Sequence, residues 1–365
     1  MDLKDEDCVE TIRQFVRNNP DIEVYDYIRR GCNGDVYFGK RKKIGDDVVL
    51  KFYWSHPNYD ATEECVILHK IKSDNVLEIK ECHFLPPSFA YFLTPKISGG
   101  DLQGVIDAKP VSSRQALEIV AGILMGLTEL HSNHCLVHRD LKPGNILIDA
   151  DTNRPIIADL GAVKKIDKAN GFVTASKSTY LYLPPESVKN NEYYFESDIY
   201  QVGIILFQLL NGFFPINEPM KWMSNREESK MISIRNSIQR GAKFEEIIGN
   251  RITKGTLINS STLPKHLDGI YKRIIDKATH LNHKLRYKNP AFFLKEIHKA
   301  LRETPEYMVE NDLLNVSHEN GKKYRIFQNR KGDYLIEQLV ANNKWHKKNG
   351  HNGKLESVLL IARIN

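Results

Sequence analysis

The pattern of hydrophobic and polar positions changes character twice along the chain, which divides it into three parts. At the N-terminus, Val9, Ile12, Phe15 and Val16 recur at helical spacing. This pattern predicts a short amphipathic helix. Residues 1–20 are therefore expected to form an N-terminal helical extension.

Five strand-like runs follow, and a helical pattern from about Asp60 to Ile71 separates the third from the fourth. Glycine-containing segments lie between the first three runs, so the sequence predicts a small antiparallel sheet with a hairpin. The predicted strands are Val24–Ile28, Asp35–Lys42, Asp46–Tyr53, Val76–Glu81 and Ala90–Thr94.

The second part, from Ser112, has helical periodicity. Helices are predicted at Ser113–His134, Glu196–Leu210, Leu267–Thr279 and Pro290–Leu301. The polar stretch 217–263 carries no clear pattern. A sheet-rich part before a helical part indicates an α+β, bilobal arrangement.

The third part begins after about Thr304. Short strands are predicted at Tyr324–Gln328, Tyr334–Leu339 and Leu355–Ile361, with turns rich in Asn and Gly between them. Residues 313–365 are therefore expected to form a small β-rich C-terminal appendage.

The net charge of +6 is concentrated in this appendage. Residues 321–365 contain ten Lys or Arg and three acids, a net charge of +7, so the remaining residues sum to about −1. With the aromatic residues Tyr324, Phe327, Tyr334 and Trp345, this charge would suit an acidic protein or a nucleic acid. The alternative is a solvated module that packs on the rest of the chain or on a partner protein.

Composition excludes several classes of protein. No run of about 18 apolar residues occurs, so no membrane span is predicted. The polar, acidic N-terminus resembles neither a signal nor a transit peptide. The five cysteines are scattered without a CxxC pair, so neither a zinc site nor a disulfide is expected, and a reducing, cytoplasmic location fits this usage.

The strongest chemical signal is the string His138-Arg139-Asp140-Leu141-Lys142-Pro143-Gly144-Asn145. Phosphoryl transfer needs a carboxylate at the attacking hydroxyl, metal ligands, and cations around the phosphates. Asp140 would supply the carboxylate and Lys142 a cation for the γ-phosphate. Asn145 offers a neutral oxygen to magnesium, which prefers oxygen ligands.

This string resembles the eukaryotic-like (Hanks-type) serine/threonine protein kinase family. Asp159-Leu160-Gly161 stands where the family has DFG, and the resemblance implies that Asp159 binds magnesium. Lys51, at the end of Val48-Val49-Leu50-Lys51, matches the ATP lysine. Its expected acidic partner is Glu64, with Glu63 as the fallback.

The resemblance also places the nucleotide. Gly31 and Gly34 remain of the family's glycine-rich loop, whose first glycine is replaced by Arg29. Ile28 and Val36 would then cover the adenine. The implied hinge supplies the gatekeeper Thr94, the backbone of Pro95 and Ile97, and Asp101 for the ribose hydroxyls. Asp101 could equally be a helix cap.

Further family marks indicate a protein substrate. Thr179 matches the residue whose hydroxyl meets Asp140 and Lys142 in Ser/Thr kinases. Glu186 and Arg286 match a buried structural ion pair, and Asp198 matches a buried aspartate that supports the catalytic loop. The resemblance implies control through phosphorylation of the activation segment, where the hydroxyls are Thr174, Ser176 and Ser178.

The sequence thus predicts a kinase domain at 21–303, with an N-lobe at 21–94, a hinge at 95–99 and a C-lobe at 100–303. The implied activity is transfer of the ATP γ-phosphoryl group to protein Ser/Thr hydroxyls, with Mg²⁺ or alternatively Mn²⁺, and autophosphorylation. The alternatives are a pseudokinase scaffold or nucleotide sensor, and a small-molecule kinase.

Overall fold

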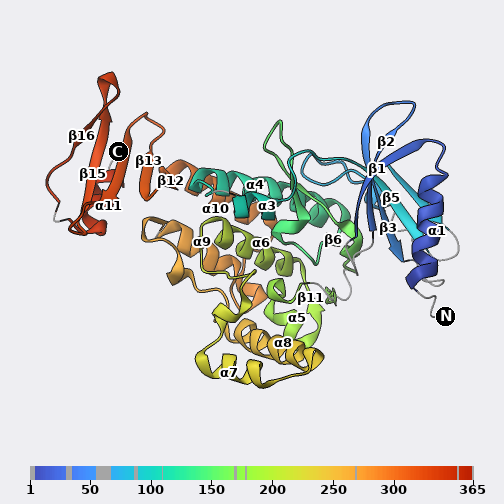
Figure 1. Cartoon of the computed structure of the whole chain (residues 1–365). Coiled ribbons are helices and arrows are strands. Elements are labelled where there is room, and N and C mark those ends of the chain that lie inside the picture. Colours follow the sequence, from blue (N-terminus) through green and yellow to red (C-terminus); the bar gives the residue numbers. More distant parts are fainter. Residues whose placement is uncertain are drawn as a thin grey trace.

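The computed structural model describes residues 5–29, 35–54, 67–85, 89–108, 110–167, 171–176, 179–267, 269–351 and 353–363. A sheet-rich lobe, a helical lobe and a second sheet follow one another along an elongated molecule (Figure 1). The predicted α+β, bilobal fold with a C-terminal β-rich part is confirmed.

The N-lobe is a five-stranded antiparallel sheet in the order β1-β2-β3-β5-β4. Its strands are β1 (Ile22–Arg29), β2 (Asp35–Arg41), β3 (Asp47–Trp54), β4 (Glu81–Leu85) and β5 (Phe89–Pro95). The predicted N-terminal helix is present as α1 (Asp5–Arg17). Its residues Ile12 and Phe15 pack on the apolar face of the sheet, with the Phe15 ring centroid 6.0 Å from that of Phe52.

The strand predicted at Val76–Glu81 is wrong, because β4 begins only at Glu81. Val76 instead forms an isolated parallel bridge to Ile157, and Val76 and Ile79 are buried in the core shared with the C-lobe. The hydrophobic positions of this segment therefore serve packing between the lobes and do not alternate along a strand.

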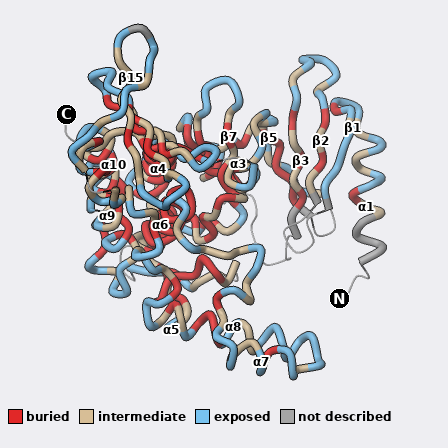
Figure 2. Tube along the Cα trace, turned by 60° about the vertical axis from the view of Figure 1, so that its left-hand side comes forward, coloured by how far each residue is buried: buried red, intermediate tan, exposed pale blue. Residues whose placement is uncertain are grey.

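The core of the C-lobe is formed by four helices: α4 (Ser113–Thr128), α6 (Phe195–Leu209), α9 (Ile270–Ala278) and α10 (Pro290–Glu303). Figure 2 shows their buried residues at the centre of this lobe. The Ser112 hydroxyl caps α4 by accepting from the N–H of Gln115 at 3.1 Å, as typical of an N-cap. After Thr128 the chain continues as a π-helical turn over Glu129–Asn133.

Smaller elements complete the C-lobe. Three two-stranded ribbons and short helices surround residues 138–145, here called the catalytic string. Two α-helices lie within the stretch 217–263 that had no clear sequence pattern. The ribbons pair β6 (Leu136–Val137) with β9 (Lys164–Lys165), β7 (Ile146–Ile148) with β8 (Pro155–Ile157), and β10 (Val173–Thr174) with β11 (Glu192–Tyr193); the helices are α3 (Leu102–Ala108), α5 (Pro185–Asn190), α7 (Asn225–Ser233) and α8 (Ser237–Lys254).

The C-terminal sheet contains five antiparallel strands in sequence order. They are β12 (Glu306–Glu310), β13 (Leu313–Ser317), β14 (Lys323–Gln328), β15 (Tyr334–Val340) and β16 (Lys344–Lys347). The sheet therefore starts before residue 313, and β12 lies against α4, where the Tyr307 N–H donates to the Ser113 hydroxyl at 2.9 Å.

The strand predicted at Leu355–Ile361 is also wrong, since these residues lie in the helix α11 (Leu355–Arg363). Val358, Leu359 and Ala362 are buried along one side of this helix in the same core as Ile336 of β15. Apolar residues in a short run suit a strand or a helix equally well, and the position of the sheet decides between them here.

The expectation of no disulfide is wrong for Cys82, which is disulfide-bonded. Cys135 is a free thiol. Within the described ranges, no helix is both long and apolar enough to cross a bilayer.

Candidate active site

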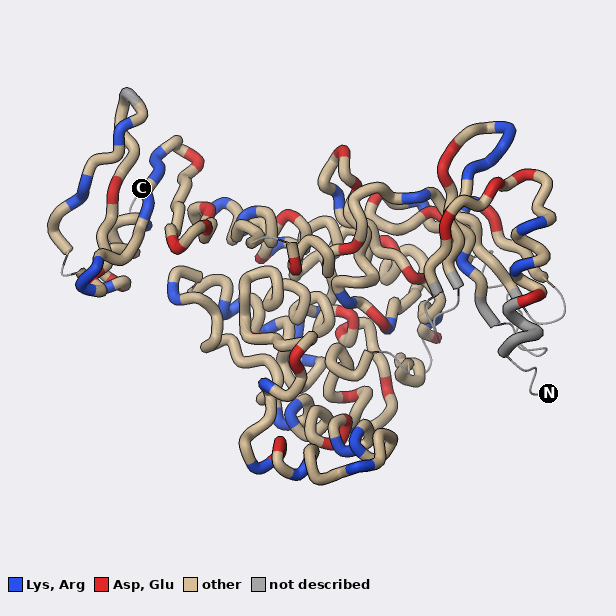
Figure 3. Tube along the Cα trace, viewed as in Figure 1, with Lys and Arg blue, Asp and Glu red and all other residues tan. Residues whose placement is uncertain are grey.

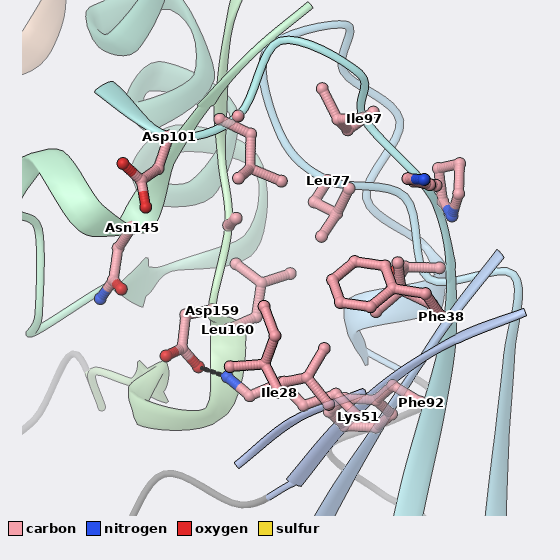
Figure 4. A pocket seen from close by; sticks show the side chains of 18 of the residues that line it. Ile28, Phe38, Lys51, Leu77, Phe92, Ile97, Asp101, Asn145, Asp159 and Leu160 are labelled. Atoms are coloured by element: carbon pink, nitrogen blue, oxygen red, sulfur yellow. Dashed lines mark hydrogen bonds and ion pairs between the residues drawn. The ribbon is translucent and has the colours of Figure 1, made fainter. Parts of the chain in front are cut away.

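A cavity of about 340 Å³ lies between the N-lobe and the C-lobe. Nine of the sequence-predicted site residues line it, and Figure 4 shows Lys51 and Asp159 meeting at one end, with Ile97 and Asp101 toward the hinge. The nine are Ile28, Val36, Lys51, Thr94, Pro95, Ile97, Asp101, Asn145 and Asp159.

Sequence reasoning missed most of the apolar lining. These residues carry no motif of their own. Several of them lie on the same strand face as a predicted residue; Val49, for example, is two positions before Lys51 on β3. The missed apolar lining residues include Phe38, Val49, Leu77, Ile79, Phe92, Leu147, Ala158 and Leu160. Together they provide a dry slot suited to a flat aromatic base.

The hinge approaches the C-lobe closely at its glycine pair. A Cβ atom on Gly99 would overlap the carbonyl oxygen of Ile148. Gly100 has φ +74° and accepts a hydrogen bond from the Ile148 N–H at 2.9 Å. Asp101 follows and accepts from the N–H of Gly104 at 2.9 Å, so it acts as a cap while also lining the cavity.

Lys51 of β3 forms an ion pair with Asp159 at the inner end of the cavity. Asp159 adopts a left-handed φ of +57°, which turns its side chain toward the N-lobe. Burial disfavours the charged form of Asp159, but the attraction of Lys51 outweighs that cost. His138 and Lys142 also favour the charged form, so the pKa of Asp159 is lowered. The carboxylate is therefore ionised at neutral pH, as a magnesium ligand must be.

Asp140 lies on the catalytic string beside this pair. Its Oδ2 accepts from Lys142 Nζ at 2.9 Å and from Asn145 Nδ2 at 2.9 Å. Its Oδ1 is buried and has no hydrogen-bond partner within the described ranges. Because a buried carboxylate oxygen normally has a partner, this atom is positioned to accept one more donor, such as a substrate hydroxyl.

Thr179 meets this cluster from the activation segment. Lys142 Nζ donates to Thr179 Oγ1 at 2.6 Å, so one ammonium group connects Thr179 with Asp140. Besides its bond to the Asp140 carboxylate, Asn145 Nδ2 donates to the Asp140 carbonyl at 2.8 Å, and these two bonds fix the orientation of the amide. The Asn145 amide oxygen then remains for a hard cation, and with Asp159 it makes an oxygen set that suits Mg²⁺.

A network of buried hydrogen bonds joins the backbone of the catalytic string to α6. Asp198 of α6 accepts from the N–H groups of His138 at 2.8 Å and Arg139 at 3.0 Å. The Asp198 carboxylate is fully buried, which disfavours its charged form. The hydrogen bonds from His131 and Tyr193 outweigh this effect, so the pKa of Asp198 is lowered.

Gln201, one turn further along α6, belongs to this network and was missed from the sequence. Its Oε1 accepts from the Leu141 N–H at 2.9 Å, and its Nε2 donates to the Tyr182 carbonyl at 3.2 Å. Gln201 carries no recognisable signal in the sequence, because two of its partners are backbone groups from distant segments and the third is the Tyr193 hydroxyl.

Glu186 and Arg286 form the expected pair. Arg286 donates to both Glu186 oxygens at 2.8 Å, and both side chains are nearly fully buried. Burial works against the charge of Glu186, but the hydrogen bonds from Arg286 prevail and lower its pKa. The pair attaches the end of the activation segment to the C-lobe.

The activation segment also contacts Arg139. Thr174 of β10 is exposed, and its carbonyl accepts from Arg139 Nη1 at 2.9 Å. Ser176 is half-buried. The predicted residues Gly31, Gly34, Glu64 and Ser178, and the fallback Glu63, lie outside the described residues.

Comparison with known proteins agrees with this geometry. The protein kinase domain family matches residues 22–299. The chain is 30% identical over 198 residues to the serine/threonine-protein kinase TIO of Arabidopsis thaliana, covering 53% of this chain and 15% of that protein.

Two further relatives have similar identity. The human serine/threonine-protein kinase D2 is 29% identical over 52% of this chain and 22% of its own length. The mitogen-activated protein kinase kinase SIPKK of Nicotiana tabacum is 27% identical over 54% of this chain and 57% of its own length. The chain thus spans between about a seventh and three fifths of these relatives. Because the family match covers most of the chain, the protein belongs to the Hanks-type protein kinase family.

Proposed function

We propose that the protein transfers the γ-phosphoryl group of ATP to serine or threonine hydroxyls of protein substrates, including its own activation segment. The observation that carries this proposal is the contact of Lys142 with both Asp140 and Thr179. It joins the candidate base to a threonine of the segment that would position a peptide. We take residues 21–303 as the catalytic domain.

The residues divide the work as follows. The apolar slot and the hinge would hold adenine, and Asp159 and Asn145 would hold magnesium, which offsets phosphate charge when bound. Asp140 Oδ1 accepts the proton of the substrate hydroxyl and orients it for attack. Lys142 stabilises the negative charge that develops on the transferred group. Lys51, now paired with Asp159, would contact the nucleotide phosphates.

The test is incubation of the purified chain with labelled ATP and Mg²⁺, followed by phosphoamino-acid analysis. Asp140→Asn keeps the shape of the side chain and removes the base, so label should fall at least about a hundredfold. Asp276→Asn is the control, because Asp276 is an exposed carboxylate on α9. Equal label on wild type and Asp140→Asn, or label on tyrosine alone, would contradict the proposal.

Autophosphorylation of the activation segment is tested by a separate experiment. Mass spectrometry of the chain after reaction with ATP should find phosphate on Thr174, Ser176 or Ser178. Phosphate at Thr174 would lie close to Arg139, which already donates to the Thr174 carbonyl. Phosphate absent from this segment in an active preparation would exclude autophosphorylation there while leaving the transfer activity standing.

A further inference from the structure

The C-terminal sheet has two different faces. Side chains alternate between the faces of a strand, and Tyr307, Val316, Tyr324, Ile326 and Ile336 are buried against α11 and the C-lobe. The opposite face, here called the outer face, carries the partly or fully exposed residues Lys323, Arg325, Phe327, Leu335, Glu337, Leu339, Trp345 and Lys347. The apolar members of the outer face do not belong to the hydrophobic core.

The outer face is organised across β14, β15 and β16. Arg325 pairs in register with Glu337, and Glu337 with Lys347. The Arg325 guanidinium lies 4.6 Å from the centroid of the Trp345 ring, and its Nε donates to Glu337 at 2.6 Å. The guanidinium thus lies over the Trp345 ring, and its hydrogen bond to Glu337 helps to hold it there.

Two further basic side chains lie on the same face of the sheet as the Arg325–Trp345 pair. Lys323 lies on β14 next to Arg325, and Lys347 lies on the last strand, β16, which pairs only with β15. Both lysines are exposed and have no acidic partner in the described ranges. Residues 321–365 contain ten Lys or Arg and only three Asp or Glu. Figure 3 shows the basic residues on these strands, at the end of the molecule remote from the N-lobe.

We propose that the outer face binds single-stranded nucleic acid. Bases would stack on Trp345 with its Arg325 partner and on Phe327, while Lys323 and Lys347 contact the phosphate backbone. An open sheet face with aromatic rings between basic residues is suited to unpaired bases. An acidic peptide would satisfy the lysines but would leave the aromatic rings of Trp345 and Phe327 without a role.

The C-terminal sheet packs on the C-lobe and shares its hydrophobic core. Tyr307 of β12 is bonded to α4 through Ser113, and Arg114 of α4 forms an ion pair with Glu319 at 3.1 Å. Bound nucleic acid would therefore lie on a sheet attached to the C-lobe, where it could bring nucleic-acid-bound proteins near the catalytic cleft. The binding itself does not rest on the kinase activity.

The first experiment measures binding to the full chain. Anisotropy of a labelled oligothymidylate or oligouridylate about 12 nucleotides long should give saturable binding that weakens as salt rises. Lys323→Glu and Lys347→Glu should each raise the Kd about tenfold and lower the salt dependence. Lys230→Glu, an exposed lysine on α7, is the matched control and should leave the Kd unchanged.

The second experiment tests stacking. The chain has three tryptophans, and stacked bases should quench the fluorescence of Trp345. Trp345→Phe keeps an aromatic ring but should abolish the quenching, whereas Trp222, which is buried, would not respond. Circular dichroism of each variant would establish that it is folded.

Several outcomes would overturn the inference. These are absence of oligonucleotide binding at low salt, equal weakening by Lys230→Glu, and quenching that persists in Trp345→Phe. Tighter binding of polyglutamate than of the oligonucleotide, with the same dependence on Lys323 and Lys347, would instead identify an acidic protein as the partner and refute the nucleic-acid assignment.

Discussion

The buried Gln201 offers a direct test of how the helical lobe positions the catalytic string. Gln201 is fully buried, and it pairs with the Leu141 N–H and the Tyr182 carbonyl. Gln201→Met keeps the length of the side chain and removes these two hydrogen bonds, together with a third that the Tyr193 hydroxyl donates to Gln201 Oε1 at 2.9 Å. Leu141 follows Asp140 directly, so the change acts on the backbone that carries the candidate base.

The size of the effect follows from the groups left unpaired. Two buried backbone groups lose their partner, and each unsatisfied group costs about 1–3 kcal/mol, so the free energy of unfolding should fall by about 2–6 kcal/mol. The Tyr193 hydroxyl keeps its hydrogen bond to Asp198, at 2.6 Å, and adds little to the loss. Where the variant stays folded, phosphoryl transfer should fall about 10–100-fold through displacement of Asp140.

Urea unfolding followed by tryptophan fluorescence measures the first quantity, and labelled ATP the second. Gln239→Met, an exposed glutamine on α8, is the matched control. An unchanged unfolding midpoint for Gln201→Met would refute the role of these hydrogen bonds. A destabilised variant with full transfer rate in native buffer would show that Gln201 supports the fold but does not position Asp140.

Two further predictions concern buried charge. Arg286→Met should lower the free energy of unfolding by about 3–5 kcal/mol because it leaves the buried Glu186 carboxylate unpaired, and adding Glu186→Gln should recover part of the loss in the same urea titration; no recovery in the double variant would contradict this. Burial, with Arg363 nearby, lowers the pKa of His266 to about 4. The unfolded chain binds the proton more readily, so stability from this group is complete above about pH 6.5 and is lost as pH falls toward 4. Urea titrations across this range should show a weaker pH dependence for His266→Asn than for wild type, and identical curves would refute the prediction.

The sequence determined the chemistry more fully than the shape. The residues of the catalytic string are close neighbours in the chain, so Asp140, Lys142 and Asn145 can be recognised without a structure. The same holds for Lys51 after its three apolar residues and for Asp159 in Asp159-Leu160-Gly161. Local spacing also predicted α1, the four core helices of the C-lobe and six of the longer strands, because a helix or strand with one buried face repeats that face in its sequence.

The tertiary structure decided what depends on distant partners. Gln201 meets Leu141 and Tyr182 only because α6 lies beneath the catalytic string. The run Leu355–Ile361 is a helix, and not the strand expected, because its apolar side chains find a sheet to cover. Such contacts join residues far apart in the chain, and their free energy is set by burial in the folded molecule, which no local pattern records.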